Sequence, residues 1–199
     1  MAKRALRRRS TVAVAAGLAV SVFAGTVIAG QFAREATQVR LQAAIEHDPL
    51  VEVATIDGGQ GFTTRGVFAQ STSAGFLCLW DATSKVSHDR MGQCNSADDP
   101  LAGRKMFIGF SYEGGPAVAD VTDARVIGLV ARDVASAQIV MSDGSRRAVA
   151  LRQVPVSLGG FRAFGHRFSH GELRRGIAPT AVVALDAGGN EIDRQATGF

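Results

Sequence analysis

From residue 49 onwards, short apolar segments alternate with polar turns that contain glycine, a pattern typical of a β-rich chain. The clearest example is the hairpin predicted over 135–153, in which Ala137, Ile139 and Met141 alternate with less apolar residues. Asp143-Gly144 then supplies a turn that tolerates positive φ. The full set of predicted strands is 50–56, 65–69, 75–81, 105–112, 125–130, 135–141, 146–153, 161–168, 181–185 and 191–195.

The spacing of these segments predicts a mainly β fold. Strands that recur about every 8–12 residues with turns between them indicate a small antiparallel β-sandwich, of the Ig-like kind, or a barrel. Residues 49–199 can bury one substantial core. We expect one domain here, with the alternative of two lobes divided near 114–124, where Gly114-Gly115-Pro116 could serve as a joint.

The segment 31–48 has a different pattern and is predicted to be a helix. It holds good helix formers without Gly or Pro, and Phe32, Ala36, Val39 and Ala43 lie on one stripe. Asp48-Pro49 ends it, because the residue before proline is disfavoured in the helical region. The helix is interpreted as a juxtamembrane stalk or as a helix that packs on the domain.

The first 30 residues predict a location outside the cytoplasm. Residues 1–9 carry five basic side chains and no acidic one, and 10–30 are almost wholly apolar or small. This order is typical of a single transmembrane helix with a cytoplasmic basic tail, and the apolar run is long for a cleaved signal sequence. A cleaved and secreted form stays open, since Val27-Ile28-Ala29 is a tolerable cleavage signal.

The excess of basic residues over acidic ones comes from the N-terminal tail that precedes the apolar segment. Five of the 22 Lys and Arg precede the apolar segment and all 18 Asp and Glu follow it, so the remainder carries 17 basic and 18 acidic residues. A nearly neutral domain lacks the basic surface that phosphate binding needs. We therefore expect no nucleic-acid partner.

Export also determines how the two cysteines are interpreted. Outside the cytoplasm a lone pair of thiols tends to oxidise, so Cys78 and Cys94 are predicted to form a structural disulfide. A Cys–His nucleophile or a zinc site is a weaker alternative, because no nucleophile signature or close pair of cysteines is present. Trp80 would lie on an apolar strand and His88-Asp89 on a polar loop that the bond restrains.

The histidines give the main candidate for chemistry. His166 and His170 have the i, i+4 spacing that can bind a metal on a helix, and Glu172 would be a third ligand. The segment is better interpreted as a strand, in which i and i+4 lie about 13 Å apart. Phe161, Phe164 and Phe168 are then predicted core residues.

The acidic pairs in the sequence are not interpreted as a calcium site. Asp98-Asp99, and Asp120 with Asp123, are expected to be solvated loop residues, since a calcium site needs more clustered oxygen ligands. No G-x-S-x-G elbow and no phosphate-binding glycine loop occurs in the sequence. We therefore predict no catalytic residue, metal site or cofactor.

A resemblance to a protein group rests on several short segments. They are Leu77-Cys78-Leu79, Cys94 with Ser96-Ala97, the runs 126–130 and 134–140, Asp143-Gly144, and the closing run 182–189. Together they resemble uncharacterised exported or membrane-anchored actinobacterial proteins over about 65–195. The resemblance implies a paired-cysteine β domain outside the cell and no established activity.

The sequence thus predicts a single-pass protein of the bacterial cell membrane. Its N-terminus would be cytoplasmic, its C-terminal domain extracytoplasmic, and its role that of a non-catalytic interaction or sensing module with an envelope protein partner. The alternative is an envelope hydrolase or metal-dependent enzyme that uses His166, His170 and Glu172.

Overall fold

The computed structural model describes residues 36–58, 62–87 and 89–198. The chain divides into two compact units, 1–46 and 47–199. Residues 36–47 are helical, and the helix ends at His47, next to the Asp48-Pro49 pair that the sequence analysis took as its end. The predicted basic tail (1–9) and apolar segment (10–30) lie outside the described residues, within which no helix is long and apolar enough to cross a membrane.

The second unit is mainly β. Its elements are β1 (Val51–Ile56), β2 (Arg65–Ser71), β3 (Phe76–Ala82), β4 (Met91–Ser96), β5 (Met106–Gly114), η1 (Val118–Asp120), β6 (Val121–Val130), β7 (Ser136–Met141), β8 (Arg146–Val149), β9 (Arg152–Gln153), η2 (Val156–Leu158), β10 (Arg162–Arg167), α2 (His170–Arg174), β11 (Pro179–Leu185) and β12 (Glu191–Ala196).

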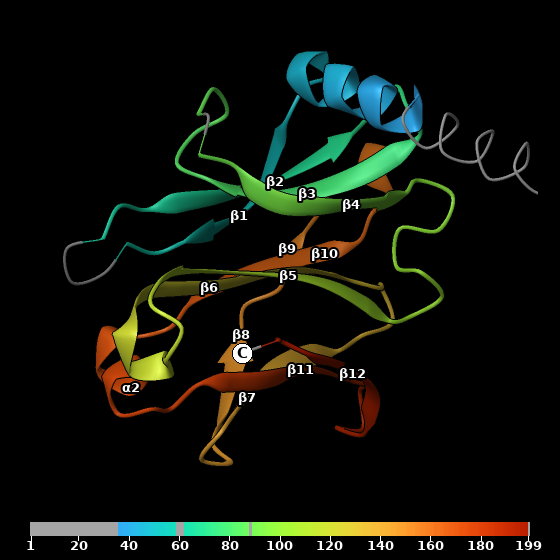
Figure 1. Ribbon diagram of the computed structural model, residues 1–199. Helices are drawn as coiled ribbons and strands as arrows, with labels where there is room; N and C mark the ends of the chain where they lie inside the picture. Colours follow the sequence, from blue (N-terminus) through green and yellow to red (C-terminus); the bar gives the residue numbers. More distant parts are fainter. Residues whose placement is uncertain (1–35, 59–61, 88, 199) are drawn as a thin grey trace, which may run out of the picture. The chain divides into compact units, whose positions relative to one another are not determined.

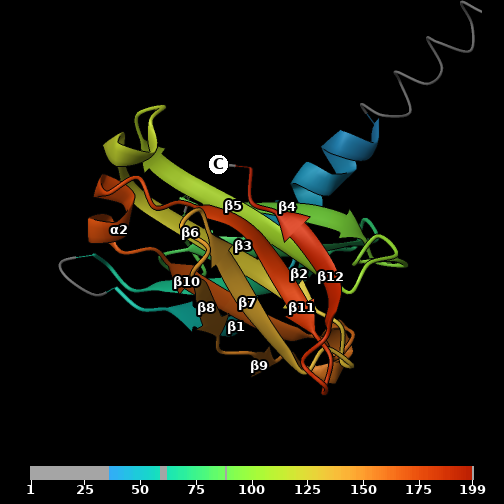
Figure 2. The same cartoon turned by 90° about the horizontal axis from the view of Figure 1, so that it is seen from below.

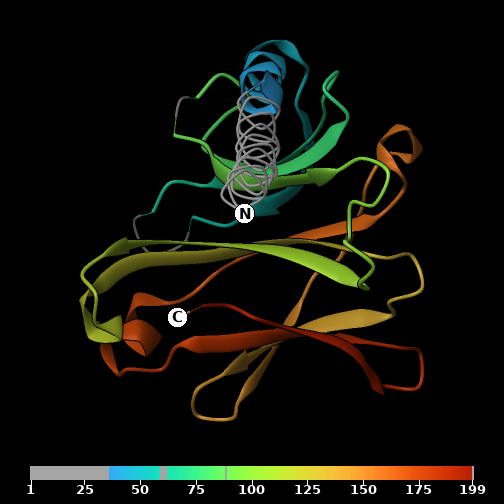
Figure 3. The same cartoon turned by 45° about the vertical axis from the view of Figure 1, so that its right-hand side comes forward.

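The strands form three antiparallel sheets of four strands each. Sheet A has the order β1-β2-β3-β4, sheet B the order β5-β6-β10-β9, and sheet C the order β12-β11-β7-β8. Figures 1 and 3 show them as three layers with sheet B in the middle, and Figure 2 views sheet C from its outer side. The expected antiparallel β fold is confirmed, but with three sheets, and the described strands close into no barrel.

Sheet B is in the middle because each of its two faces carries a cluster of apolar side chains. In β6, Val126 and Val130 pack towards sheet C, while Ile127 and Leu129 pack towards sheet A. The sequence 126–130 is therefore a continuous apolar run, as expected of a strand covered on both sides. By contrast, β7 of sheet C alternates between exposed or half-buried and buried residues, because its outer face meets solvent.

Two hydrophobic clusters fill the two spaces between the layers. The cluster between sheets B and C includes Met106, Ile139, Phe164, Phe168 and Val182. The cluster between sheets A and B includes Ile56, Val67, Leu79, Leu129 and Ala163. Phe164 and Phe168 are buried and Phe161 packs against the second cluster, so all three phenylalanines belong to the core as predicted.

The predicted hairpins have the expected turns. At the β7–β8 turn, Gly144 has a φ of 80° and donates its N–H to the carbonyl of Met141, so Asp143-Gly144 makes the turn that the sequence indicated. At the β11–β12 turn, Gly189 has a φ of 82°. The segment 114–124 spans the end of β5, the short helix η1 and the start of β6, and β5 and β6 pair in one sheet inside the compact unit 47–199.

The two cysteines form a disulfide between neighbouring strands. Cys78 of β3 lies directly opposite Cys94 of β4, and their Cα atoms are 3.9 Å apart. The bond predicted from export is therefore present. Its position differs from the expectation, since Cys94 lies inside a strand and the polar loop before it covers residues 83–90.

Candidate functional site

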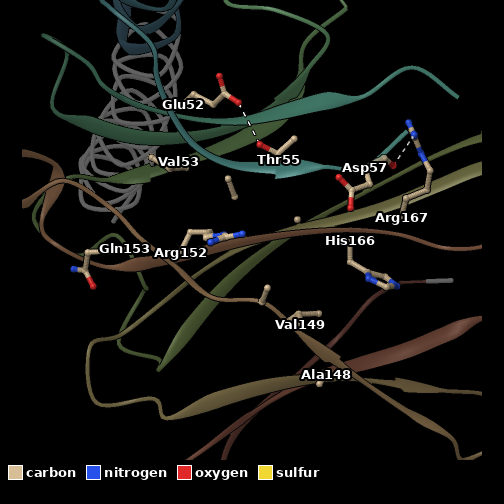
Figure 4. Close-up of a pocket in the computed structure, with 13 residues that line it drawn as sticks. Glu52, Val53, Thr55, Asp57, Ala148, Val149, Arg152, Gln153, His166 and Arg167 are labelled. Atoms are coloured by element: carbon tan, nitrogen blue, oxygen red, sulfur yellow. Dashed lines mark hydrogen bonds between the residues drawn. The ribbon is translucent and has the colours of Figure 1, made fainter. Parts of the chain in front are cut away.

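A groove of about 900 Å³ opens along one side of the β unit (Figure 4). Its walls come from strands of all three sheets: β1 of sheet A, β9 and β10 of sheet B, and β8 of sheet C. We call it the edge groove. Its lining residues are Glu52, Val53, Ala54, Thr55, Asp57, Ala148, Val149, Ala150, Arg152, Gln153, Gly165, His166 and Arg167.

The groove exists because three sheets end at this side. β1 is the outer strand of sheet A and β8 the outer strand of sheet C. In sheet B the outer strand β9 is only two residues long, so it pairs with Arg162 and Ala163 and leaves the rest of β10 uncovered. The chain that would lengthen β9 instead crosses from β8 in sheet C to β9 in sheet B through Ala150 and Leu151.

The upper part of the groove is set by a close approach of β10 to sheet A. A Cβ atom on Gly165 would lie 2.5 Å from Cγ1 of Ile56 and 2.7 Å from Cγ2 of Val67. Only glycine allows the two backbones to come this near. The edge of β1 is thereby held directly above the uncovered part of β10.

Charged side chains of both signs line the groove. Glu52 and Asp57 come from the β1 side, and Arg152 and Arg167 from sheet B. Figure 4 shows Arg152 between the residues of β1 and the β8 residues Ala148 and Val149. Within the described residues, the guanidinium of Arg152 has no hydrogen bond or ion pair, so its charge is available to a ligand.

Arg167, in contrast, is fully engaged. Its Nε donates to Oδ1 of Asp123 at 3.0 Å, and its Nη1 donates to the carbonyls of Asp57, Gly58 and Thr63 at 3.1–3.2 Å. Its guanidinium also stands 4.9 Å above the ring of Phe62. Arg167 therefore fastens the ends of the β1–β2 connection to β10 and shapes one end of the groove.

Arg167 is the last member of a chain of alternating charges between sheets A and B. Arg65 donates to Asp81 and Asp89, Arg125 donates to Asp81 and Asp123, and Arg167 donates to Asp123. The Arg125–Asp81 pair is 2.5 Å long and both side chains are 1% exposed. We call this set the ion-pair chain: Asp89, Arg65, Asp81, Arg125, Asp123 and Arg167.

Burial of these charges is possible because each has partners of the opposite sign. Desolvation lowers the pKa of Arg125, but the carboxylates of Asp81, Asp123 and Glu113 together raise it by more, so the net pKa is raised. At the exposed end, burial raises the pKa of Asp89. The hydroxyl of Ser87, the N–H of Thr83 and the guanidinium of Arg65 together lower it to about 2.

The location of Asp123 corrects the sequence interpretation. Asp120 and Asp123 were expected to be solvated loop acids, but Asp123 is 6% exposed and binds two arginines. Its position follows from β6, which begins at Val121, four residues earlier than the predicted strand. Asp123, Arg125, Ile127 and Leu129 therefore share the face of β6 that meets sheet A.

His166 lies on β10 and lines the lower part of the groove (Figure 4). Its ring stands edge-on to Phe168, with centroids 5.1 Å apart. Burial lowers its pKa, the negative charge of Glu172 raises it, and the charge of Arg147 lowers it again. The net effect is a lowered pKa, which favours the neutral imidazole.

The other two candidates are placed at the start of α2. Ser169 caps this helix and accepts from the N–H of Glu172, whose carboxylate accepts from the Ser169 hydroxyl at 2.6 Å and from Arg147 at 2.9 Å. His170 is the first helical residue, and its Nδ1 is buried without a hydrogen-bond partner. Both oxygens of Glu172 are therefore engaged in fixing the helix and binding β8.

The structure does not bring the three residues into a metal site. Throughout the described residues, no group of three or more His, Cys, Asp or Glu side chains could hold a metal ion. His166 belongs to β10, within the predicted strand, whereas His170 begins α2, a helix that the sequence analysis did not predict. Within the predicted set, the negative charge of Glu172 acts on His166, and His170 and Glu172 share α2.

The loop 83–90, which the sequence analysis considered as a restrained polar loop, contributes Asp89 to the ion-pair chain. Asp89 accepts from Nη1 of Arg65 at 2.7 Å, and its backbone carbonyl accepts from Nη2 at 3.1 Å. His88 lies outside the described residues. A smaller pocket of about 380 Å³ opens near this loop, between β4 of sheet A and β5 of sheet B.

Sequence reasoning missed Arg152 and the edge groove. The signal in the sequence is weak, since Arg152 falls within the single strand predicted over 146–153. The groove depends on that strand dividing into β8 and β9 in different sheets. A pattern of apolar and polar residues does not report which sheet a strand joins.

No protein-family model matches the chain, and comparison with curated proteins and with solved structures found no match. The resemblance to exported actinobacterial proteins gains no support from these comparisons. Its structural content, a β-rich domain with a paired cysteine bond, is present.

Proposed function

We propose that the chain is an extracytoplasmic interaction module of the bacterial envelope, anchored by its N-terminal segment, and that it binds its partner in the edge groove. The observation that carries the proposal is the groove itself, which is lined by the edges of all three sheets and by charged side chains of both signs. Its volume of about 900 Å³ falls in the range of ligand-binding clefts.

The anchor and the location are supported by sequence and chemistry. A basic segment followed by an apolar run of about 20 residues is typical of a signal anchor. The disulfide between Cys78 and Cys94 suits an oxidising compartment outside the cytoplasm. We also propose that the chain is related to the exported or membrane-anchored actinobacterial proteins that its sequence resembles.

The side chains that could support catalysis favour a binding role instead. A general base needs a free carboxylate or imidazole within reach of a substrate. Glu172 uses both oxygens within the fold, and His166 has no hydrogen-bonded acid or nucleophile beside it within the described residues. These contacts support a binding role for the groove over the hydrolase alternative that uses His166, His170 and Glu172.

A photo-cross-linking amino acid in place of Ala150 tests the proposal. Ala150 is exposed and lines the groove, while the matched control, Ala187, is exposed in the β11–β12 turn. We expect irradiation of cells to give a discrete, membrane-associated protein adduct from position 150 and none from position 187.

The His170→Ala variant, combined with the cross-linker at position 150, separates binding from catalysis. We expect it to fold and to give the same adduct, because His170 does not line the groove. Equal adducts from positions 150 and 187, or none from either, contradict the proposal. Loss of biological activity in His170→Ala with unchanged stability would restore the hydrolase alternative.

A further inference from the structure

We propose that the edge groove binds an extended peptide segment of a partner protein, which adds to sheet B as a strand beside β10 and places an acidic side chain next to Arg152. This inference rests on the proposed function and specifies the occupant of its site. Its basis is a row of backbone groups on β10 that no other strand of the described residues pairs with.

The direction of these backbone groups follows from two hydrogen bonds. In an antiparallel pair, the N–H and C=O of alternate residues point to the same neighbour. Phe168 donates its N–H to Ala124 of β6, so the groups of Phe164 and His166 also point to β6. The carbonyl of Phe161 accepts from the N–H of Val154, so the backbone N–H and C=O of odd-numbered residues of β10 point to the β9 side.

The backbone N–H and C=O of Gly165 and Arg167 therefore point outward, and β9 does not reach them. β9 pairs with Arg162 and Ala163 only. Beyond it, the chain turns away to sheet C. An uncovered edge of this kind is a template for another strand.

The surroundings of this edge fit a single added strand. β1 lies above the groove and β8 below it, so an incoming segment has walls on both sides. The groove between β1 and β8 borders the part of β10 that β9 leaves uncovered, which is the position that a strand added to sheet B would take. A rise of about 3.3 Å per residue means that about five residues would pass from β9 to the end of β10.

The charges of the groove specify the side chains of the peptide. Arg152 has no partner among the described residues and would pair with one carboxylate. Glu52 and Asp57 on the β1 wall repel further acidic residues. We therefore expect an otherwise neutral β-forming segment with a single acidic residue.

The test uses the full chain in detergent micelles and a panel of blocked pentapeptides. The probes are acetyl-Thr-Val-Asp-Val-Thr-amide, the same peptide with Asn or Lys in the centre, and two versions N-methylated on alternate residues. We expect the Asp peptide to bind more tightly than the Lys peptide, by roughly threefold to tenfold. Only one of the two N-methylated versions should bind, because alternate amides face β10.

Amide hydrogen exchange measured by NMR reports strand addition directly. In the free protein, the amides of Gly165 and Arg167 should exchange much faster than those of Phe164 and His166. Addition of the Asp peptide should slow Gly165 and Arg167. If the peptide binds elsewhere on the protein, the exchange of the Gly165 and Arg167 amides should stay unchanged.

Two pairs of variants provide the controls. Ala150→Trp should abolish binding by filling the groove, while Ala187→Trp should have no effect. Arg152→Glu should reverse the preference between the Asp and Lys peptides. Arg174→Glu, a charge reversal at an exposed residue of α2 outside the groove, should leave that preference unchanged.

The outcomes separate this inference from the proposed function. If the peptides bind and Ala150→Trp prevents it, but the amides of Gly165 and Arg167 stay unprotected, strand addition is wrong and the groove remains a binding site. If no peptide binds, the inference is wrong, and the cross-linking at position 150 decides the proposed function independently.

Discussion

Sheets B and C are joined by apolar packing, whereas the interface between sheets A and B contains both an apolar cluster and the buried ion-pair chain. Between B and C, ion pairs occur at the rim, as in Arg104–Asp193 at 2.7 Å, where the arginine is 47% exposed. Between A and B, Arg125 and Asp81 are each 1% exposed. The middle sheet therefore meets its two neighbours through different chemistry.

From this difference we infer that the interface between sheets A and B fixes the position of sheet A, while apolar packing supplies most of the stability. Apolar surfaces stabilise in proportion to the area that they bury and have little directional preference. Buried ion pairs gain little net free energy, but they strongly penalise any arrangement that leaves a charge unpaired. We infer that the ion-pair chain fixes the register of sheet A on sheet B, and with it the edge of β1 above the groove.

The largest effect is expected from breaking the ion-pair chain at its centre. Asp81→Asn removes the carboxylate that Arg65 and Arg125 share, so it leaves two buried guanidinium groups under-paired. We expect the free energy of unfolding to fall by about 3–5 kcal/mol, measured by urea denaturation.

The matched control is Asp98→Asn at an exposed residue, which should change stability by less than about 0.5 kcal/mol. A loss of similar size in both variants, or none in Asp81→Asn, would mean that the chain of charges does not hold sheet A.

An apolar truncation between sheets B and C should have a comparable but somewhat smaller effect. Ile139→Ala removes a fully buried side chain from β7 and leaves a cavity in that cluster. We expect a loss of about 3 kcal/mol, with little dependence on salt or pH because no charge is exposed. Val156→Ala, at a residue that is 77% exposed, is the control. A strong pH dependence of the Ile139→Ala effect would argue against a purely apolar interface.

Removal of the disulfide tests sheet A alone. The bond joins β3 to β4, an outer strand whose residues are mostly exposed or half-buried. Replacing both cysteines by alanine should cost about 2–3 kcal/mol in the chain-entropy account. Reductant should destabilise the wild-type protein by a similar amount and leave the double variant unchanged. If the double variant is as stable as the oxidised protein, β4 is held by its other contacts.

The smallest expected effect is a pH dependence from His166. Its folded-state pKa is lowered by burial, so the unfolded chain binds a proton more readily than the folded one. Stability is therefore fully present above the ordinary histidine pKa of about 6.5 and falls as the pH is lowered through that value. Unfolding measured from pH 7.5 to pH 5.5 should show this slope in the wild type and less of it in His166→Gln. An unchanged slope would assign it to other groups.

Much of the β structure could be predicted because apolar alternation and turn residues are local signals. Each predicted strand overlaps an observed one, and the Asp143-Gly144 hairpin and the disulfide are confirmed. β4 was missed because Met91–Ser96 is a polar outer strand without an apolar face. Its membership in sheet A depends on pairing with β3, which leaves no periodic trace in the sequence.

The candidate site could not be predicted for a related reason. Asp123 looks like a solvated loop acid when only neighbouring residues are considered, and the burial of Asp123 and Arg125 depends on Asp81 and Arg167 from distant strands. The edge groove depends on the crossing of the chain from β8 to β9 between two sheets. Both features follow from the layering of the sheets, which local patterns do not encode.

The most direct test of the central claim is hydrogen exchange of the Asp81→Asn variant, followed strand by strand under conditions in which it remains folded. We predict that amides of β2 and β3 in sheet A lose protection relative to the wild type, while amides of β7 and β11 in sheet C retain theirs. Equal loss of protection in sheets A and C, or none in sheet A, would contradict the claim that buried charge pairing holds sheet A in place.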